Sequence, residues 1–210
     1  MRKLAIIEPL LLFGLIVAYI WRVRFVCPRC WIAIAALMFC SHLLHRESPR
    51  ALGFTFHNLR KELGELVPRL LLTAVPLLVA GIKLRMIRQT GLGGALLEAA
   101  LYLPWGLVQQ YALNGYFLNR FDAAVSPRMA SPLAALLFCF VHAPNPILMT
   151  LSFPLGWYAT LLYRRSRNLY VLGMAHAAVG SLVFLLAPDS VTHHMRVGPG
   201  WFQPWPGSGR

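Results

Sequence analysis

The sequence predicts an all-α fold, a multispanning helical membrane bundle of about seven spans plus an interfacial amphipathic helix. Of its 210 residues, 58% are hydrophobic and 13% are charged, with a mean hydropathy of +0.59. Soluble domains usually have about 45–50% apolar and about 25% charged residues. The basic residues form short runs between apolar segments, as in WRVR, KLRMIR and YRRSR, which is typical of membrane loops. We therefore expect residues 1–210 to form a single integral-membrane domain.

A helix needs about 20 residues to cross the hydrocarbon core of a bilayer. The candidate spans are residues 5–21, 31–44, 66–82, 91–118, 131–143, 147–163 and 169–187. The second and fifth are short enough to be tilted or partial spans. The fourth is long enough to continue beyond the membrane, or to bend at Pro104, which lacks a backbone donor.

Two further segments are predicted to lie at the membrane interface. The segment LGFTFHNLRKELGELVPR, between the second and third spans, mixes charged and apolar residues as an amphipathic interfacial helix does. The tail HHMRVGPGWFQPWPGSGR is rich in Pro, Gly and Trp, so we expect it to be irregular. The first apolar segment resembles a signal peptide, but Glu8 interrupts it and no small-residue cleavage site follows. It is expected to be retained as the first span.

The net charge of +13 would suggest a nucleic-acid partner in a soluble protein. Between apolar segments, the same charge predicts contact with membrane lipids that carry anionic headgroups, and no nucleic acid is expected as a partner. The distribution of Lys and Arg over the loops favours a cytoplasmic N-terminus. The expected location is an integral, multi-pass position in a membrane, the bacterial inner (cytoplasmic) membrane.

The four cysteines include one CxxC motif, formed by Cys27 and Cys30. A structural zinc site needs four ligands, and neither a second CxxC nor a nearby HxxxH accompanies this motif. We expect no metal and no cofactor. Cys40 and Cys139 are expected to pack within spans, and the redox compartment stays open.

Three polar clusters interrupt the apolar spans, each on a different predicted helix. Polar side chains in a span usually face the bundle interior, so the three clusters could meet at one cavity. The first cluster lies in VQQYALNGYFL, the second in FCFVHAPNP and the third in LGMAHAAVG. Their polar members and one aromatic neighbour are Gln109, Gln110, Asn114, Phe138, His142, Asn145 and His176.

The amides of the first cluster have two interpretations. Gln110 and Asn114 are one helical turn apart and could bond each other, while Gln109 points about 100° away and could face the cavity. Alternatively, all three hold helices together, at about 0.6 kcal/mol each. His142 and His176 are either satisfied interior residues or catalytic groups. A zinc site is the weaker interpretation, because no intramembrane carboxylate accompanies the two histidines.

In order and spacing, these clusters resemble the motifs of the CPBP family, the membrane-embedded CAAX-type prenyl proteases and the related Abi proteins. The family pattern is E-E-x-x-x-R, then F-x-x-x-H, often with Asn three residues later, then H-x-x-x-N or a small residue. The matching residues here are Gln109, Gln110 and Asn114, then Phe138, His142 and Asn145, then His176 and Gly180. The resemblance covers about residues 90–187.

The resemblance implies a role for each matched position. The residues at 109 and 142 would activate a water for attack on a peptide carbonyl, and those at 176 and 180 would stabilise the oxyanion. The residue at 110 would pair with the residue at 114. Both motif glutamates are glutamines here, the arginine is asparagine and the last asparagine is glycine. Glutamine can hold a water but cannot take its proton near neutral pH.

Three function classes follow. The first is an intramembrane endopeptidase, a hydrolase in which His142 is the base, Gln109 positions water and His176 stabilises the oxyanion. The second is a catalytically inert pseudoprotease that binds peptides or lipid-modified tails. The third, a solute or ion pathway, is suggested only by the polar residues in spans and is disfavoured by the lack of nearby acids. The expected partners are membrane lipids and a membrane-associated peptide or protein substrate.

Overall fold

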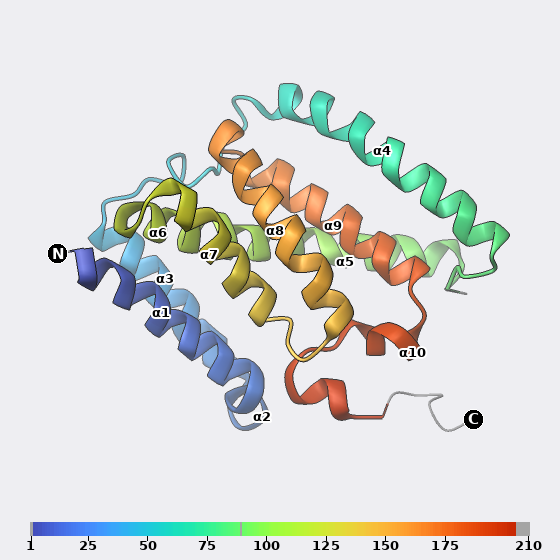
Figure 1. Cartoon of the computed structure of the whole chain (residues 1–210), viewed down its shortest axis with the longest axis horizontal. Coiled ribbons are helices and arrows are strands. Elements are labelled where there is room, and N and C mark those ends of the chain that lie inside the picture. Colours follow the sequence, from blue (N-terminus) through green and yellow to red (C-terminus); the bar gives the residue numbers. More distant parts are fainter. Residues whose placement is uncertain (1, 89, 205–210) are drawn as a thin grey trace.

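The computed structural model of the chain describes residues 2–88 and 90–204, and those residues form helices and turns without a strand. Figure 1 shows long helices running roughly along one axis, with the N-terminus near one end of the bundle. The predicted all-α class is confirmed. Each of the seven apolar segments forms a helix or most of one. The longer helices are α1, α3, α4, α5, α7, α8 and α9, and shorter helical pieces join them.

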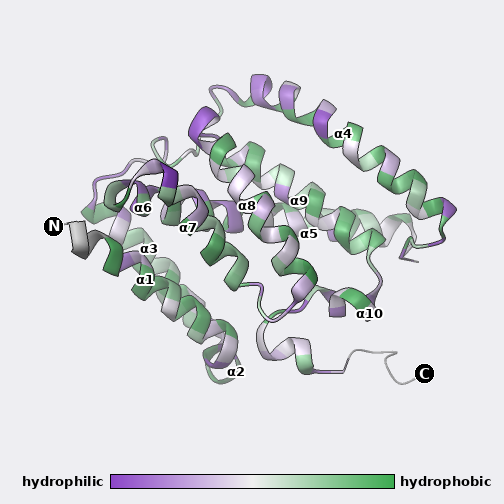
Figure 2. Cartoon of the chain, in the orientation of Figure 1, coloured by the Kyte–Doolittle hydropathy of each residue, from purple (hydrophilic) through white to green (hydrophobic). Residues whose placement is uncertain are grey.

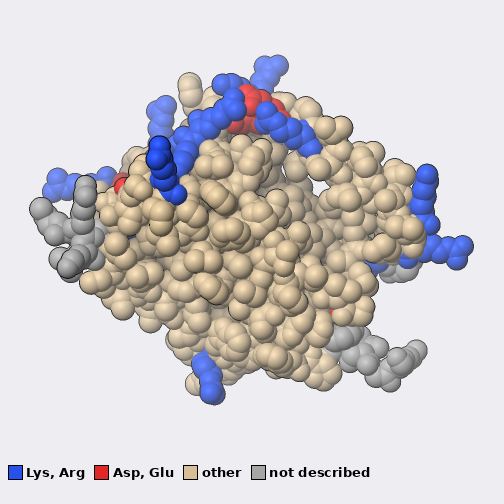
Figure 3. All heavy atoms as spheres, viewed as in Figure 1, with Lys and Arg blue, Asp and Glu red and all other residues tan. Residues whose placement is uncertain are grey.

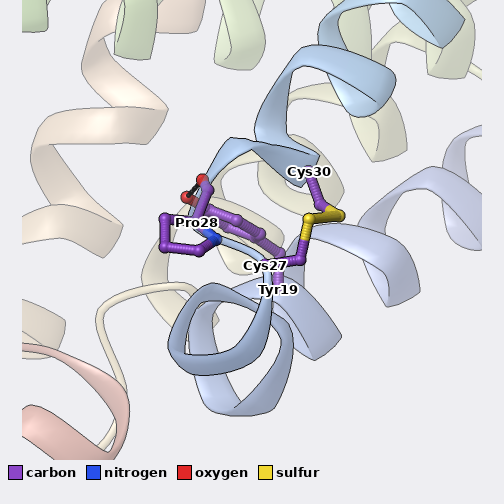
Figure 4. Close-up of a disulfide and its surroundings, with 4 residues drawn as sticks. All are labelled: Tyr19, Cys27, Pro28 and Cys30. Carbon is purple, nitrogen blue, oxygen red and sulfur yellow. Dashed lines mark hydrogen bonds between the residues drawn. A yellow bond between two sulfur atoms is a disulfide. The ribbon is translucent and has the colours of Figure 1, made fainter.

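The first two predicted spans form a helical hairpin. Helix α1 (Arg2–Ala18) continues through η1 (Tyr19–Val23) and α2 (Arg24–Val26), and after a turn η2 (Pro28–Cys30) leads into α3 (Trp31–Leu44). At this turn Cys27 and Cys30 form a disulfide, which settles the state of the CxxC motif. The Tyr19 hydroxyl donates to the Pro28 carbonyl at 2.7 Å, so the turn is also tied to the preceding helix (Figure 4).

The third predicted span is part of a longer helix, α4 (Leu59–Lys83). The amphipathic segment predicted before it is not a separate helix, because residues 59–69 form the first turns of α4. Leu, Glu, Lys and Arg all favour helix, so the charged stretch continues into the apolar one without a break. Figure 2 shows this change along α4, from hydrophilic at its start to hydrophobic further on. The helix lies at the edge of the bundle, packed against α9 (Leu169–Leu186) (Figure 1).

The fourth predicted span belongs to one uninterrupted helical stretch, Gly91–Ala124. It consists of α5 (Gly91–Gln110), the π-helical segment η3 (Tyr111–Leu118) and α6 (Asn119–Ala124). The stretch passes through Pro104 as α-helix, and its irregular part begins directly after the two glutamines. Wide π turns are often found at functional sites, because they re-aim side chains without ending the helix.

The remaining spans pack in pairs. Helix α7 (Pro127–Phe140) lies against α8 (Pro146–Ser166), and α5 lies along α9. The α5–α9 contact is close because Gly106 faces Gly173. A Cβ atom at Gly106 would stand 2.6 Å from the Gly173 carbonyl oxygen, and one at Gly173 would stand 2.9 Å from the Cα of Leu107. Small residues at such crossings are how membrane helices bring their backbones together.

The C-terminal part is irregular, as predicted, and consists of short turns. These are α10 (Asp189–Thr192), η4 (His193–Met195) and η5 (Gly198–Phe202). They return to the α7–α8 connection, where the Gly198 amide donates to the Ala143 carbonyl at 2.7 Å. Residues 205–210, the end of the predicted tail, lie outside the described part of the chain.

The surface of the bundle fits a lipid environment. Four helical stretches are long and apolar enough to cross a membrane: Ile6–Val26, Leu59–Lys83, Gly91–Ala124 and Leu169–Leu186. Large apolar side chains on them point outwards, including Leu72 and Leu92, which are 79% and 78% exposed. In Figure 3 most Lys and Arg atoms lie along one edge, and a broad uncharged band separates that edge from the few others in view. The chain is an integral membrane protein.

Arg88, in the connection between α4 and α5, forms an ion pair with Asp189, just after the end of α9. We expect this pair to stabilise the fold and to lose that effect in acid. Arg88 donates to Asp189 at 2.5 Å, and this bond is the main reason why the pKa of Asp189 lies below its ordinary value of 3.8. The stabilisation should be present above that ordinary value and lost as the pH falls through the lowered one. Asp189→Asn should cost about 1 kcal/mol at pH 7. Thermal unfolding between pH 7 and pH 3 should show the two proteins converging in acid, and a constant gap would contradict this.

Candidate active site

The amide cluster is organised around Gln110, which is buried near the end of α5. Its side-chain oxygen accepts a hydrogen bond from the Asn114 amide at 2.8 Å, as predicted from their spacing of one helical turn. The side-chain nitrogen of Gln110 lies 3.2 Å from Nδ1 of His176 on α9. A neutral chain of hydrogen bonds therefore runs from the π segment η3 through α5 to α9.

This chain of bonds sets the tautomer of His176. An amide nitrogen only donates, so Nδ1 of His176 must accept, and the ring proton lies on Nε2. His176 thus presents an N–H donor at the side of its ring away from Gln110. Such a donor can stabilise negative charge that develops on a carbonyl oxygen.

His142 has the opposite tautomer. It lies in the turn between α7 and α8, and its Nδ1 is 2.6 Å from the backbone carbonyl oxygen of Phe138. A carbonyl oxygen only accepts, so the proton lies on Nδ1 and the lone pair of neutral His142 lies on Nε2. A ring nitrogen with a free lone pair can take a proton from water, which is what a general base does.

Phe138 stands between the two histidines. Its ring makes edge contacts with His142, at 4.9 Å between ring centroids, and with His176, at 5.9 Å. Phe138 is itself buried between α7 and α8. The second and third predicted clusters therefore meet around one aromatic ring, and the first cluster joins them through the contact between Gln110 and His176.

Gln109, the neighbour of Gln110, is placed differently. Its side chain is partly exposed and makes no hydrogen bond to another residue in the described part of the chain. The structure therefore links Gln110, not Gln109, directly to a histidine. Because nothing holds the Gln109 side chain, it is free to turn towards a water or a substrate.

Asn145 has a structural role. Its side-chain oxygen accepts from the Leu148 amide and caps α8, while its nitrogen donates to the carbonyls of Thr192 and Arg196 at 2.8 and 3.1 Å. Both of its N–H donors and its side-chain oxygen are engaged by backbone groups, and the side chain is fully buried. Asn145 thus holds the C-terminal segment on the turn that carries His142.

At Gly180 the structure leaves no room for a side chain. A Cβ atom there would stand 2.6 Å from the ring of Tyr102 on α5. The ring occupies the space that an asparagine at this position would need, and the Tyr102 hydroxyl points to the Met195 sulfur at 3.4 Å. Tyr102 was not predicted as a site residue, because nothing in the sequence pairs it with Gly180.

A second polar cluster was also not predicted, and it centres on Arg120 in α6, just beyond the end of η3 that lies away from Gln110. The side chain of Arg120 is almost fully buried and donates to Glu8 on α1 at 3.1 Å and to Glu47 at 2.8 Å. It also donates to Ser41 on α3 at 2.8 Å, and Tyr116 donates to Glu8 at 2.9 Å. Three separate segments of the chain are thereby held to one guanidinium.

His42 extends this cluster towards α5. It lies 2.7 Å from Glu47 through Nδ1 and 2.8 Å from the Tyr111 hydroxyl through Nε2. Burial alone would raise the pKa of Glu47, but the hydrogen bonds from Arg120 and His42 outweigh burial and hold this pKa below its ordinary value of 4.5. Glu8, an acid inside the first predicted span, was the signal that could have pointed to the cluster.

The hydrogen bonds of Gln110 predict a clear difference between two neighbouring residues. Gln110→Leu should lower the free energy of unfolding by about 1–3 kcal/mol, because it leaves the buried Asn114 amide and His176 Nδ1 without their partner. Gln109→Leu is the matched control and should change stability little. Thermal unfolding of both variants in one detergent measures this. Equal losses would mean that the Gln110 bonds do not stabilise the fold.

Comparison with known proteins finds one family model that matches part of the chain. Residues 92–182 match the family model described as Type II CAAX prenyl endopeptidase Rce1-like. The matched region runs from the start of α5 into α9 and contains the two glutamines, both histidines and Gly180. The earlier resemblance to the CPBP family is confirmed for this region. No curated protein and no solved structure matches the chain.

Proposed function

We propose that this chain hydrolyses peptide bonds of membrane-associated substrates, with His142 as the base. Its Rce1-like residues 92–182 support an intramembrane peptidase-like function. The observation that carries the proposal is the pair of complementary histidines around Phe138. His142 offers a lone pair on Nε2 and His176 offers a proton on Nε2. Water attack on an amide needs both a base for the water and a donor for the oxyanion.

The remaining site residues support this division of roles. Gln109 would hold the attacking water by its amide while His142 takes the proton. Gln110 and Asn114 keep His176 in the tautomer that donates, and Asn145 and Phe138 fix the turn and the ring on which His142 rests. Gly180 supplies no side chain, so His176 would be the donor to the oxyanion from α9.

Cleavage of a panel of membrane-anchored peptides by the purified full chain tests the proposal. We expect cleavage by the wild type and a loss of about 10²–10⁴-fold in His142→Ala, the range that a positioned base supplies. His57→Ala is a matched control, because His57 is an exposed histidine in a loop outside the site. Equal cleavage by wild type and His142→Ala would contradict the assignment of the base.

A second candidate function is a pseudoprotease that binds peptides or lipid-modified tails without cutting them. It is favoured by the neutral glutamines at both motif glutamate positions and by the Tyr102 ring, which fills the space of the missing asparagine. This function predicts saturable binding of the panel peptides with no cleavage product. Binding that is lost in a Phe138→Ala variant, with no turnover in any variant, would support it over hydrolysis.

The orientation in the membrane is part of the proposal. Disulfides persist in oxidising compartments, and the Cys27–Cys30 disulfide lies at the end of the bundle opposite the N-terminus. Basic residues are found at both ends of the bundle, but more of them lie at the N-terminal end, as expected for a cytoplasmic side. In the described chain these are Arg46, Arg50, Arg60, Lys61, Arg120, Arg128, Arg164, Arg165 and Arg167. We infer a cytoplasmic N-terminus, in the cytoplasmic membrane of a bacterium.

Thiol labelling in intact cells tests this orientation without any need for activity. After treatment with a membrane-impermeant reductant, Cys27 and Cys30 should react with an impermeant maleimide added outside the cells. The Cys27→Ser/Cys30→Ser variant is the control for labelling of Cys40 and Cys139. Labelling only after the cells are opened would reverse the orientation, and labelling of the pair without reductant would mean that the disulfide does not form in the cell.

A further inference from the structure

Beside the first span lies a polar pocket that the proposed function does not use. It has a volume of about 390 Å³ and is formed where the C-terminal segment passes the end of α2. We call it the arginine pocket, and its lining residues are Arg24, His194, Met195, Arg196, Val197, Gly200 and Gln203. Two arginines and a histidine face it, and no acidic side chain lines it.

The two arginines lack a carboxylate partner. Arg24 donates to the Val197 carbonyl at 3.2 Å, and its Nε is buried without a hydrogen bond. Arg196 lies 3.3–3.4 Å from two carbonyl oxygens of residues 203 and 204. Neither guanidinium forms an ion pair with any residue in 6–88 or 90–204. Because an arginine stays charged in a protein, the pocket carries positive charge that the described chain does not neutralise.

Asp189, the acid that contacts a lining residue of the pocket in the described part of the chain, is already engaged. Asp189 lies 3.2 Å from Nε2 of His194 and accepts from Arg88 at 2.5 Å. Its charge is therefore shared with those two side chains and does not reach Arg24 or Arg196 as a partner. An anion entering the pocket would meet two guanidiniums without displacing an existing ion pair.

The backbone around the pocket is held in an uncommon shape. His193, His194 and Met195 all have left-handed backbone angles, with φ of 48°, 54° and 55°. Non-glycine residues rarely adopt this conformation, and they keep it where the surrounding contacts determine it. Here the contacts are the stack of His193 on Trp201, with ring centroids 3.8 Å apart, and the Asn145 bonds to Thr192 and Arg196. The pocket is thus preformed by the fold.

The position of the pocket relative to the membrane indicates which kind of anion it binds. Arg24 lies near the end of the first span, Ile6–Val26, which is where the headgroups of a bilayer begin. Apolar side chains beside the pocket are strongly exposed, with Val26 at 89% and Phe202 at 69%, as expected for residues that contact acyl chains. Planar guanidiniums bind phosphate oxygens through paired N–H donors. We propose that the arginine pocket binds the phosphate of a phospholipid headgroup.

Binding there would also act on the candidate active site. The segment that carries Arg196 is hydrogen-bonded to the turn of His142, through the Gly198 amide to Ala143 and through Asn145. A phosphate that joins Arg24 to Arg196 would hold this segment on α2 and on the His142 turn together. The lipid site itself does not depend on the proposed hydrolysis, so each can fail without the other.

Native mass spectrometry of the purified full chain tests the site. The protein is mixed with phosphatidylglycerol, phosphatidylcholine or inorganic phosphate, and the bound fraction is measured. We expect one tightly retained phospholipid on the wild type and at least about tenfold weaker retention in Arg24→Gln/Arg196→Gln, since two charge-assisted bonds are lost. Arg22→Gln is the matched control, because Arg22 is exposed nearby and does not line the pocket.

The outcomes are distinct. Loss of the bound lipid in the double variant but not in Arg22→Gln supports the site. If the double variant unfolds, the single variant Arg196→Gln is measured instead and should show part of the loss. Retention by all variants would overturn the proposal. Binding of inorganic phosphate with no arginine-dependent retention of either lipid would also overturn it, because the ligand would then be a free anion. Greater retention of phosphatidylglycerol than of phosphatidylcholine would support a preference for an anionic headgroup at the same site.

Discussion

Replacing Arg120 with methionine should lower the free energy of unfolding by about 3 kcal/mol, the lower end of the range for breaking a buried ion pair. Methionine keeps the unbranched apolar stem of the side chain but leaves Glu8 and Glu47 without the guanidinium that pairs with both. The two carboxylates are 35% and 22% exposed, so water screens part of the loss. Ser41 loses its donor in the same step. Thermal unfolding in detergent at pH 7 measures the effect.

The same variant should respond to pH in a defined direction. The pKa of Glu47 is lowered in the folded protein, so its stabilising contribution is present above the ordinary value of 4.5 and is lost as the pH falls through the lowered value. Wild type and Arg120→Met should therefore become more similar in stability as the pH falls from 4.5 through the lowered pKa of Glu47. Arg128→Met removes an exposed arginine and is the control. A loss in Arg128→Met as large as that in Arg120→Met would attribute the effect to net charge rather than to the cluster.

The sequence indicated the local bonds of the candidate site and that its three clusters could meet, but not which residues of different helices touch. The bond between Gln110 and Asn114 follows from their spacing on one helix face, and it is present. The contact between Gln110 and His176 joins residues far apart in the sequence, and it depends on the close crossing of α5 and α9 at Gly106 and Gly173. Helix periodicity carries no information about such a crossing.

The Arg120 cluster shows the same limit. Its members come from positions 8, 41, 42, 47, 111, 116 and 120, which no spacing rule connects. Glu8 was seen only as an interruption of an apolar run, although an acid in a span needs a partner of opposite charge. Arg120 lies two residues beyond the predicted fourth span, 91–118, so a search for a basic partner would have found it only if it had included the ends of the spans.

Two other differences have simple physical reasons. The charged segment before the third span was predicted as a separate interfacial helix, but residues with high helix propensity continued it into α4. Asn145 was predicted beside His142 from the family pattern, and it lies there, but its side chain is consumed by the cap of α8 and by the C-terminal segment. Distant backbone partners of this kind cannot be inferred from a motif.

If the site has lost the base that the family keeps at this position, Gln109→Glu should create or raise hydrolysis of a peptide substrate by about 10²–10⁴-fold, the contribution of a positioned general base. Glutamate has nearly the volume of glutamine, and the Gln109 side chain is partly exposed without a hydrogen bond, so the exchange should cost little stability. The single substitution is a sharper test than the full family triplet. Asn114 is completely buried in the π segment, and an arginine there would overpack the helix and remove the bond to Gln110.

The double variant Gln109→Glu/His142→Ala separates the two bases. If the carboxylate takes the proton from water and His142 only assists, the double variant should keep part of the gain. If His142 is the base and Gln109 only holds the water, Gln109→Glu should gain little, and the double variant should be as inactive as His142→Ala. Gln110→Glu is the control for adding a carboxylate one position away, where it faces His176 and Asn114 instead of the open side of α5. If the peptides bind to every variant and no variant cleaves them, the function of this chain is that of a pseudoprotease. The reason is that a carboxylate restored beside His142 should have revealed any latent hydrolysis.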